Sequence, residues 1–435
     1  MGIPFYFVSL IRSHSGITKP VKRIEVDVVG FDFNCLIHRY LKDEDPIHSV
    51  IKAIAYLLDN VIIAKKIIIA FDGIVPYAKI VQQRYRRMRS KEEGVFDRNQ
   101  ISPETAYMRE LENAVLSRFP SAILSRTNQA GEGEHKLVLE LQKLKPTERK
   151  SVCIYGLDAD LILICLQNKG LSETGKMYLL RESSEFNDPS LKSAEFATLD
   201  IWGLSSQLPL RIDQYMALSI LCFGNDFMPN LGIFSLREEG YERALQYYKD
   251  CGKPNLLLPA GRALFLKYSA SKEFSVLREL VTKRNRPEEK TIIGKTDSLI
   301  CQKYNLHILE GVSDISKPVE AYWKTFHWTM HYFTKSSPIN WHWYYPYPDA
   351  PLITDIVKYT ETIAETGRLN YTVADQLHFI LPGPSLRRTK RKVKYVDEIH
   401  DETRNPWMKR HDWEMKPRIS LPWHPTVELT SVCLL

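Results

Sequence analysis

The sequence predicts an α/β protein with a mostly parallel sheet, helices on both faces, and a smaller helical, aromatic-rich second domain. In the first 230 residues, short apolar runs alternate with amphipathic stretches, which is typical of a parallel α/β sheet. Beyond about residue 235, long helical stretches follow, and seven of the eight tryptophans lie after residue 322. We therefore expect a first domain over residues 1–235, a second over 236–390, and a C-terminal tail over 391–435 that packs on the body.

Three apolar runs predict strands of the sheet, and each delivers an aspartate to its end. The runs cover residues 23–33, 66–71 and 151–155, and the aspartates are Asp32, Asp72 and Asp158. Ligands of open parallel sheets bind beyond the carboxyl ends of the strands. Three aspartates at that edge are therefore a functional signal as well as a packing pattern.

Two further patterns predict helices that cover the sheet. Apolar residues recur at helical spacing between residues 47 and 61. Ser102 and Pro103 have the N-cap and first-turn chemistry of a helix start. A third helix is expected to begin shortly after Asp72.

Composition excludes several classes of protein. With 435 residues, of which 44% are hydrophobic and 26% charged, the chain is neither disordered nor collagen-like. Its seven cysteines are scattered and none are spaced C-x-x-C, which argues against a zinc knuckle and favours a reducing compartment. No signal peptide or membrane span is expected. We expect a cytoplasmic monomer.

Seven acids stand in short motifs that follow an apolar strand or a helix stopped by glycine: Asp32, Asp72, Glu132, Glu134, Asp158, Asp160 and Asp226. Any one of them alone is more simply a helix cap or a turn residue. Carboxylates that converge on one sheet edge repel each other unless cations bind between them. Oxygen ligands suit Mg²⁺, and two ions about 4 Å apart are the usual arrangement for phosphodiester hydrolysis. The set therefore predicts a two-metal catalytic site.

A basic stripe follows the second aspartate. Lys79, Gln83, Arg86 and Arg87 fall on one face of the helix expected after Asp72. Arginine forks and a lysine point charge suit a terminal phosphate. A solvated basic helix face is the alternative, but the closeness to Asp72 favours a phosphate pocket beside the metals.

Residues 387–394 form a second basic run, with six basic residues and no acid. Three interpretations stay open: a contact to a phosphate backbone, a nuclear localisation signal, or a solvated loop. The backbone contact is slightly favoured, because a nucleic acid that enters or leaves the core would need a basic surface.

Taken in order, these motifs resemble the XRN family of 5′→3′ exoribonucleases, whose catalytic core is distantly similar to flap endonucleases and PIN-type nucleases. The resemblance covers roughly residues 1–390 and is carried by M-G-I-P-F-Y-F, F-D-F-N-C-L-I-H, F-D-G-I-V-P-Y-A-K-I-V-Q-Q-R-Y-R-R, G-E-G-E-H-K, Y-G-L-D-A-D-L-I, G-N-D-F-M-P and W-H-W-Y-Y-P-Y-P-D-A-P. It implies a PIN/flap-nuclease-like fold and metal binding by the seven acids, with Mn²⁺ able to replace Mg²⁺. It also implies a 5′-monophosphate pocket at Lys79, Gln83, Arg86 and Arg87, and stacking of the first base between His38 and Trp328.

The chain departs from the family pattern in several places. Cys35 replaces a usual glycine and Tyr85 a small residue, although neither change removes a ligand. The segment between Lys91 and Ser102 is much shorter than in the family, and we expect the accessory domains of the large members to be missing. We therefore expect a compact, catalytic-core-only member without the helical tower that larger members carry.

The resulting hypothesis is a Mg²⁺-dependent 5′→3′ exoribonuclease. It would convert single-stranded RNA with a 5′-monophosphate into nucleoside 5′-monophosphates, in RNA decay or processing. A flap-type 5′ DNA nuclease would share the metal chemistry, but the intact Q-Q-R-x-R-R stripe favours the exoribonuclease. A catalytically inert RNA-binding scaffold is disfavoured, because a surface that binds polyanions gains nothing from seven acids.

Overall fold

The computed structural model describes residues 3, 5–89, 98–186, 188–284, 290, 292–309, 311–347 and 349–380, without the side chains of 84–89, 98, 189 and 378. The predicted tail 391–435 and the basic run 387–394 lie outside these residues. The division at residue 235 stays a prediction.

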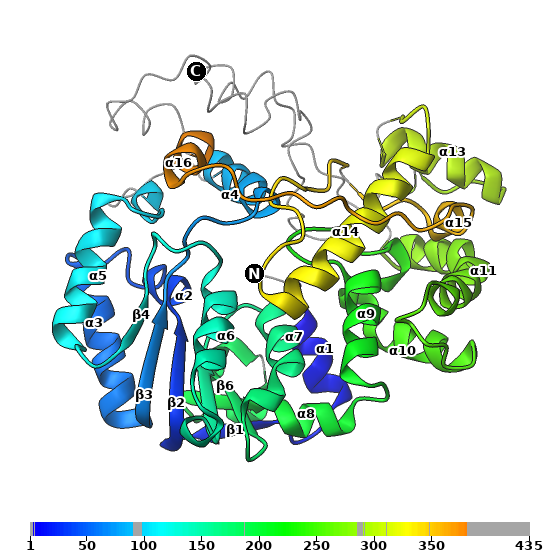
Figure 1. The fold of residues 1–435 in the computed structure, drawn as a ribbon. Helices are drawn as coiled ribbons and strands as arrows, with labels where there is room; N and C mark the ends of the chain where they lie inside the picture. The colour runs from blue at the N-terminus through cyan, green and yellow to red at the C-terminus, as the bar shows by residue number, and fades with distance from the viewer. Residues whose placement is uncertain are drawn as a thin grey trace.

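A seven-stranded sheet forms the centre of the first half of the chain (Figure 1). The order across the sheet is β1-β7-β6-β5-β2-β3-β4. The five strands from β6 to β4 are parallel, and β7 pairs antiparallel with both β6 and β1. This confirms the predicted α/β class with a mostly parallel sheet. The strands are β1 (Thr18–Val21), β2 (Ile24–Asp32), β3 (Ile62–Ala70), β4 (Ile123–Ser125), β5 (Ser151–Tyr155), β6 (Lys176–Glu182) and β7 (Phe196–Asp200).

Helices cover both faces of the sheet, as predicted. Successive side chains of a strand point to opposite faces, so Ile68 and Ile69 of β3 enter different apolar cores. The core with Ile69 is closed by α3 and α5, and the core with Ile68 by α1, α6 and α7. The helices of this half are α1 (Tyr6–Ser13), α2 (Phe33–Ile37), α3 (Pro46–Tyr56), α4 (Tyr77–Arg89), α5 (Ala106–Arg118), α6 (Gly133–Lys143), α7 (Asp160–Gln167), α8 (Ile201–Gln207) and α9 (Ile212–Phe223).

The predicted helices differ from the observed ones in detail. The periodicity over 47–61 corresponds to α3, which continues as a π-helical turn over Leu57–Val61. Ser102 and Pro103 do not start a helix. The helix α5 begins at Ala106, where Thr105 caps the first turn by accepting a hydrogen bond from the backbone N–H of Met108 (3.3 Å).

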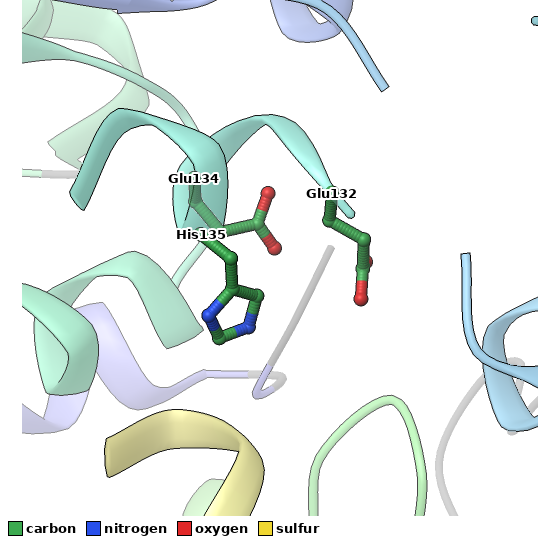
Figure 2. Close-up of side chains that lie close together, drawn as sticks. All are labelled: Glu132, Glu134 and His135. Carbon is green, nitrogen blue, oxygen red and sulfur yellow. The ribbon is translucent and has the colours of Figure 1, made fainter. Parts of the chain in front are cut away.

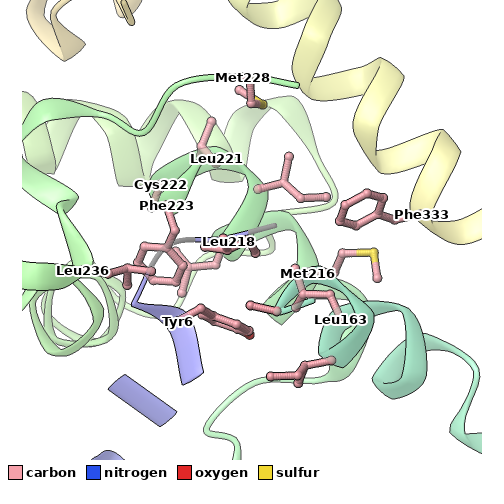
Figure 3. Close-up of a cluster of buried hydrophobic side chains, with 14 of the residues drawn as sticks. Tyr6, Leu163, Met216, Leu218, Leu221, Cys222, Phe223, Met228, Leu236 and Phe333 are labelled. Atoms are coloured by element: carbon pink, nitrogen blue, oxygen red, sulfur yellow. The ribbon is translucent and has the colours of Figure 1, made fainter. Parts of the chain in front are cut away.

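The described residues between 236 and 380 are mainly helical, and they share the larger apolar core with the sheet. Figure 3 shows Tyr6 of α1, Leu163 of α7, Met216 of α9 and Phe333 of α14 in one cluster of buried side chains. The helix α14 packs against both α7 and α9. None of the described helices is long and apolar enough to cross a membrane. The helices of this half are α10 (Gly240–Asp250), α11 (Pro259–Arg284), α13 (Asp297–His307), α14 (Ser316–Lys335), α15 (Ile353–Ile356) and α16 (Val373–Ile380).

The last helix of the described residues returns to the first half of the chain. Helix α16 packs on α4 through a small apolar core that includes Ile80 and Phe379 (Figure 1). Gln376 of α16 accepts a hydrogen bond from the backbone N–H of Val75 (3.0 Å), and the hydroxyl of Tyr371 donates to the Val75 carbonyl (2.8 Å). The loop between Asp72 and α4 is therefore held by a segment some 300 residues away in sequence.

Candidate active site

The ends of β2 and β3 bring the first two acids together. Asp32 is the last residue of β2 and pairs in register with Ala70 of β3, two residues before Asp72. Carboxylate oxygens of Asp32, Asp72 and Glu134 lie within 4.8 Å of one another. Three of the seven predicted acids thus lie together at the carboxyl edge of the sheet.

A glycine lets α6 approach this edge. The backbone N–H of Gly133, the first residue of α6, donates a hydrogen bond to Oδ1 of Asp72 (2.7 Å). A β-carbon at Gly133 would lie 2.7 Å from Oδ1 of Asp32 and 3.1 Å from the Ala70 carbonyl oxygen. The second glycine of G-E-G-E-H-K is therefore required by space, because any side chain would displace an acid of the site.

The start of α6 supplies a second group of ligand atoms. Glu132 precedes the first turn of α6, and Glu134 and His135 lie within it (Figure 2). One ligand atom of each residue lies within 4.8 Å of the other two, and all three residues are buried. Burial, together with the positive charge of Lys79, lowers the pKa of His135 to about 3, so the imidazole is neutral at physiological pH. His135 was not among the residues predicted from sequence.

The remaining acids come from the loop after β5 and from the G-N-D-F turn. Asp160 begins α7, is buried, and accepts a hydrogen bond from the backbone N–H of Leu161 (3.1 Å). Asp226 follows the left-handed Gly224 (φ 67°), where a β-carbon would lie 2.4 Å from the backbone nitrogen of Asn230. Burial and the charges of Asp158 and Asp226 raise the pKa of Asp160 to about 7.

Burial and the neighbouring acids strongly raise the pKa values at two positions, Asp32 and Glu134. Burial and the charges of Asp72, Asp158 and Asp160 hold the pKa of Asp32 well above its ordinary value. Burial and the charges of Glu132 and Asp32 do the same to the pKa of Glu134. Such a set of buried carboxylates needs protons or cations to be stable. Carboxylate oxygens are the ligands that hard divalent ions prefer, so these residues fit Mg²⁺ or Mn²⁺.

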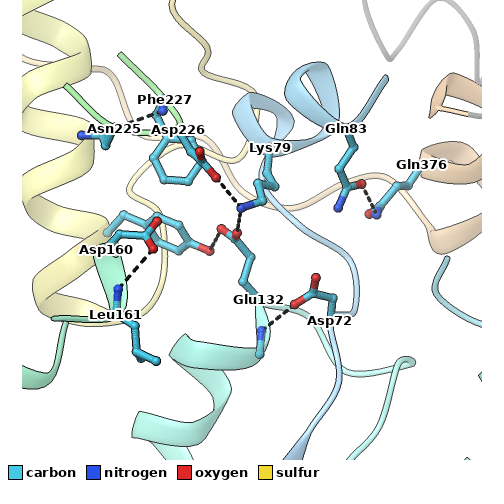
Figure 4. Close-up of polar contacts among 12 residues, drawn as sticks. Asp72, Lys79, Gln83, Glu132, Asp160, Leu161, Asn225, Asp226, Phe227 and Gln376 are labelled. Atoms are coloured by element: carbon cyan, nitrogen blue, oxygen red, sulfur yellow. Dashed lines mark hydrogen bonds and ion pairs between the residues drawn. The ribbon is translucent and has the colours of Figure 1, made fainter. Parts of the chain in front are cut away.

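Lys79 lies among the acids. Its Nζ is 2.6 Å from Oε2 of Glu132 and 2.9 Å from Oδ2 of Asp226 (Figure 4). Lys79 was predicted to line the phosphate pocket, whereas in the structure it forms ion pairs with two predicted metal ligands. The difference arises because Lys79 lies in the first turn of α4, which starts close to Asp72.

The rest of the predicted phosphate pocket follows along α4. Oε1 of Gln83 is 3.5 Å from Nε2 of Gln376 on α16, as Figure 4 shows. Arg86 and Arg87 belong to α4, but their side chains lie outside the described residues. The pocket stays a prediction.

The two predicted stacking residues have different environments. His38 follows α2 and is exposed. Trp328 is fully buried, donates a hydrogen bond from Nε1 to the Asn340 carbonyl (2.7 Å), and contacts the ring of Phe227 edge-on at 5.1 Å. The assignment of Trp328 to base stacking is therefore wrong for this structure, because a ring inside the core has no free face for a base.

Comparison with known protein families matches both halves of the chain. A family described as "XRN 5′-3′ exonuclease N-terminus" matches residues 1–95 and 90–183, and one described as "Xrn1 helical domain" matches residues 301–388. The chain belongs to the XRN family. The resemblance stated from the motifs is thereby confirmed.

Relatives of this XRN protein include 5′-3′ exoribonuclease 1 of Saccharomyces cerevisiae, 27% identical over 58% of this chain and 21% of that protein. The human 5′-3′ exoribonuclease 1 is 24% identical over 88% of this chain and 31% of that protein. The chain thus spans about a fifth to a third of the length of these two relatives.

Similar solved structures are more distant. The catalytic core of Rad2 in complex with DNA substrate has a TM-score of 0.39 and 14% identity, covering 75% of this chain and 85% of that one. Flap endonuclease-1 from Methanococcus jannaschii has a TM-score of 0.32 and 12% identity, covering 67% and 95%.

Proposed function

We propose that this XRN protein is a 5′→3′ exoribonuclease that hydrolyses 5′-monophosphorylated single-stranded RNA to nucleoside 5′-monophosphates, in cytoplasmic RNA decay or processing. The observation that carries the proposal is the meeting of buried acids at the carboxyl edge of the sheet, in a chain whose family is that of 5′-3′ exonucleases. The perturbed pKa values of Asp32, Glu134 and Asp160 support the same site, because strongly perturbed acids gather where charge is needed for chemistry.

The residues that would hold two Mg²⁺ ions, or Mn²⁺ in their place, are the seven predicted acids: Asp32, Asp72, Glu132, Glu134, Asp158, Asp160 and Asp226. When bound, such ions lower the pKa of an attacking water and stabilise the leaving oxygen. The chain itself contributes the rigid placement of the carboxylates, since Asp32 ends a central strand and the Gly133 amide fixes Asp72.

Helix α4 would set the length of each step along the RNA. It carries Lys79 beside the acids, and then Gln83, Arg86 and Arg87 farther along the same face. Lys79 and Arg87 are separated by about 12 Å along the helix axis, from a rise of about 1.5 Å per residue. A terminal phosphate held at the far end would therefore lie at a fixed distance from the metals, and hydrolysis would leave a new 5′ phosphate for the next step.

The exposed ring of His38 would stack on the first base. Stacking of this kind does not depend on sequence, because every base offers a π-face worth about 1–3 kcal/mol. With Trp328 inside the core, His38 is the residue of the predicted pair whose side chain is accessible.

Digestion of matched RNAs that differ only at the 5′ end tests this function. We expect rapid loss of the 5′-monophosphate RNA with Mg²⁺, and slow loss of RNA with a hydroxyl, triphosphate or cap. Equal rates on all four ends would contradict the phosphate pocket. Faster cleavage of a DNA flap would favour a flap-type nuclease, and tight RNA binding without hydrolysis would favour a binding scaffold.

A further inference from the structure

A tyrosine of the helical half contacts the acid cluster, which consists of the seven predicted acids Asp32, Asp72, Glu132, Glu134, Asp158, Asp160 and Asp226. Tyr332 of α14 is buried, and its hydroxyl donates a hydrogen bond to Oε1 of Glu132 (2.8 Å), a residue 200 positions earlier in the chain. The tyrosine ring also lies over the imidazole of His135, with ring centres 4.0 Å apart and planes tilted by 32°. Tyr332 thus contacts two residues, Glu132 and His135, of the ligand group formed by Glu132, Glu134 and His135.

The chemistry of the two groups fixes the direction of this hydrogen bond. A tyrosine hydroxyl, whose ordinary pKa is about 10, carries its proton at physiological pH, and its oxygen lies 2.8 Å from Oε1 of Glu132. A phenol can then donate to the carboxylate, and a hydrogen bond to a charged acceptor is stronger than a neutral one.

The two oxygens of Glu132 therefore have different partners. Oε1 is held by Tyr332, whereas Oε2 lies 2.6 Å from Nζ of Lys79, which also contacts Asp226. The carboxylate cannot rotate without breaking one of these contacts. As a result Oε2 faces the space between Glu132 and Asp226, where Lys79 now supplies the positive charge.

We propose that Tyr332 is a positioning residue of the metal site, whose hydroxyl orients Glu132 so that one carboxylate oxygen is presented to the divalent cation. The inference rests on the proposed function, because it assumes that Glu132 is a metal ligand. It also gives the helical half of the chain a role in the site, since the oxygen that orients Glu132 comes from α14. Groups that orient metal ligands in this way typically change metal affinity by about 10–100-fold when they are removed.

Tyr332→Phe tests the role, because it removes the hydroxyl and keeps the ring against His135. Tyr322→Phe is the matched control: Tyr322 lies on the same helix, is equally buried, and donates to the Leu221 carbonyl in the core (2.7 Å). Mn²⁺ binding to the whole protein is measured without RNA, from the electron paramagnetic resonance signal of free Mn²⁺. Melting temperatures of both variants are recorded with EDTA.

We expect Tyr332→Phe to bind Mn²⁺ about tenfold more weakly than the wild type. Tyr322→Phe should bind Mn²⁺ within about twofold of the wild type. The melting temperatures of the two variants should fall by similar amounts. Unchanged Mn²⁺ affinity in Tyr332→Phe would overturn the inference. Equal weakening in both variants would also overturn it, because the effect would then follow from the loss of stability in α14. If the wild type binds no Mn²⁺, the proposed function itself fails; if the wild type binds and Tyr332→Phe matches it, only the inference fails.

Discussion

The ammonium group of Lys79 forms a buried ion pair with the carboxylate of Glu132, with 2.6 Å between Nζ and Oε2. Both side chains are almost inaccessible, at 7% and 2% exposure. The second contact of Lys79, to Asp226, makes it a cation shared by two predicted metal ligands. The positive charge of Lys79 is therefore coupled to the negative charge of the acid cluster. Folding stability and its dependence on Mg²⁺ should both reflect this coupling.

Replacing this lysine removes a buried positive charge from among the acids. We expect Lys79→Met to lower the free energy of unfolding by about 3 kcal/mol in EDTA, as for other buried pairs that lose one partner. Mg²⁺ should restore part of that loss, because it supplies the missing charge. Urea denaturation with EDTA and with Mg²⁺ measures both effects.

The exposed pair of Lys65 and Asp27 provides the control for this variant. Lys65→Met should leave the free energy of unfolding nearly unchanged, because Lys65 is 77% exposed and surface pairs contribute little. A loss in Lys79→Met that is the same with and without Mg²⁺ would contradict the coupling of Lys79 to the metal site.

Gly133→Ala should distort the metal site by a steric clash alone. The added β-carbon would lie 2.7 Å from Oδ1 of Asp32, so either that carboxylate or the start of α6 must move. We expect Mn²⁺ binding at least tenfold weaker, measured by isothermal titration calorimetry. Gly170→Ala is the matched control, because nothing lies within 4 Å of its added β-carbon. A Mn²⁺ affinity of Gly133→Ala equal to that of the wild type would refute the close approach of residue 133 to the Asp32 carboxylate.

Stability without metal should fall as the pH rises. The pKa of Asp160 is raised from 3.8 to about 7, so the folded protein binds more protons than the unfolded chain between these values. Its contribution is therefore fully present below about pH 4 and is lost as the pH approaches 7. Asp32 and Glu134 act in the same direction. Urea unfolding at a series of pH values in EDTA measures this loss.

Bound Mg²⁺ should make the loss with pH smaller, because it replaces the protons of the acid cluster. The carboxyl of Glu273 provides an internal reference, since burial raises its pKa to about 7 too, but its partners are Ile353 and Thr354 at the start of α15. The loss of folding stability that Glu273 causes as the pH rises should therefore persist when Mg²⁺ is bound. A pH dependence that Mg²⁺ leaves unchanged would show that the cluster does not bind the ion.

The corrected assignment of Trp328 leads to opposite expectations for the two aromatic residues. Trp328→Phe should destabilise the protein by about 1–3 kcal/mol, because it leaves the Asn340 carbonyl without its donor, and should leave the KM for RNA unchanged. His38→Ala should raise the KM with little effect on stability, since the side chain is exposed. Thermal unfolding and RNA hydrolysis kinetics separate the two. A raised KM in Trp328→Phe at unchanged stability would support the original assignment.

The approach of Asp32 to Asp72 could be predicted from sequence, because both positions depend on strand ends. Parallel strands share one carboxyl edge, so Asp32 and Asp72 had to approach each other once both strands were identified. The second glycine of G-E-G-E-H-K has its explanation only in the structure, since the short contact to Asp32 depends on how α6 meets the sheet.

The partners of the acids could not be predicted in the same way. Helical spacing places Lys79 and Gln83 on one face, but it does not fix the distance from that face to Glu132. Trp328 and Tyr332 are four residues apart on α14 and look equivalent in sequence, yet Tyr332 donates to Glu132 and Trp328 donates to the backbone. Contacts of this kind depend on packing between segments 200 residues apart.

If the acid cluster removes nucleotides one at a time from a phosphorylated 5′ end, the first product must carry the 5′ phosphate. Digestion of an RNA labelled at its 5′-monophosphate, with Mg²⁺, by the wild type and by Asp160→Asn measures this directly. We expect a labelled mononucleotide as the first product at the earliest times, and its loss with Asp160→Asn or EDTA. A labelled ladder that shortens from the 3′ end, or release of labelled oligonucleotides, would contradict it.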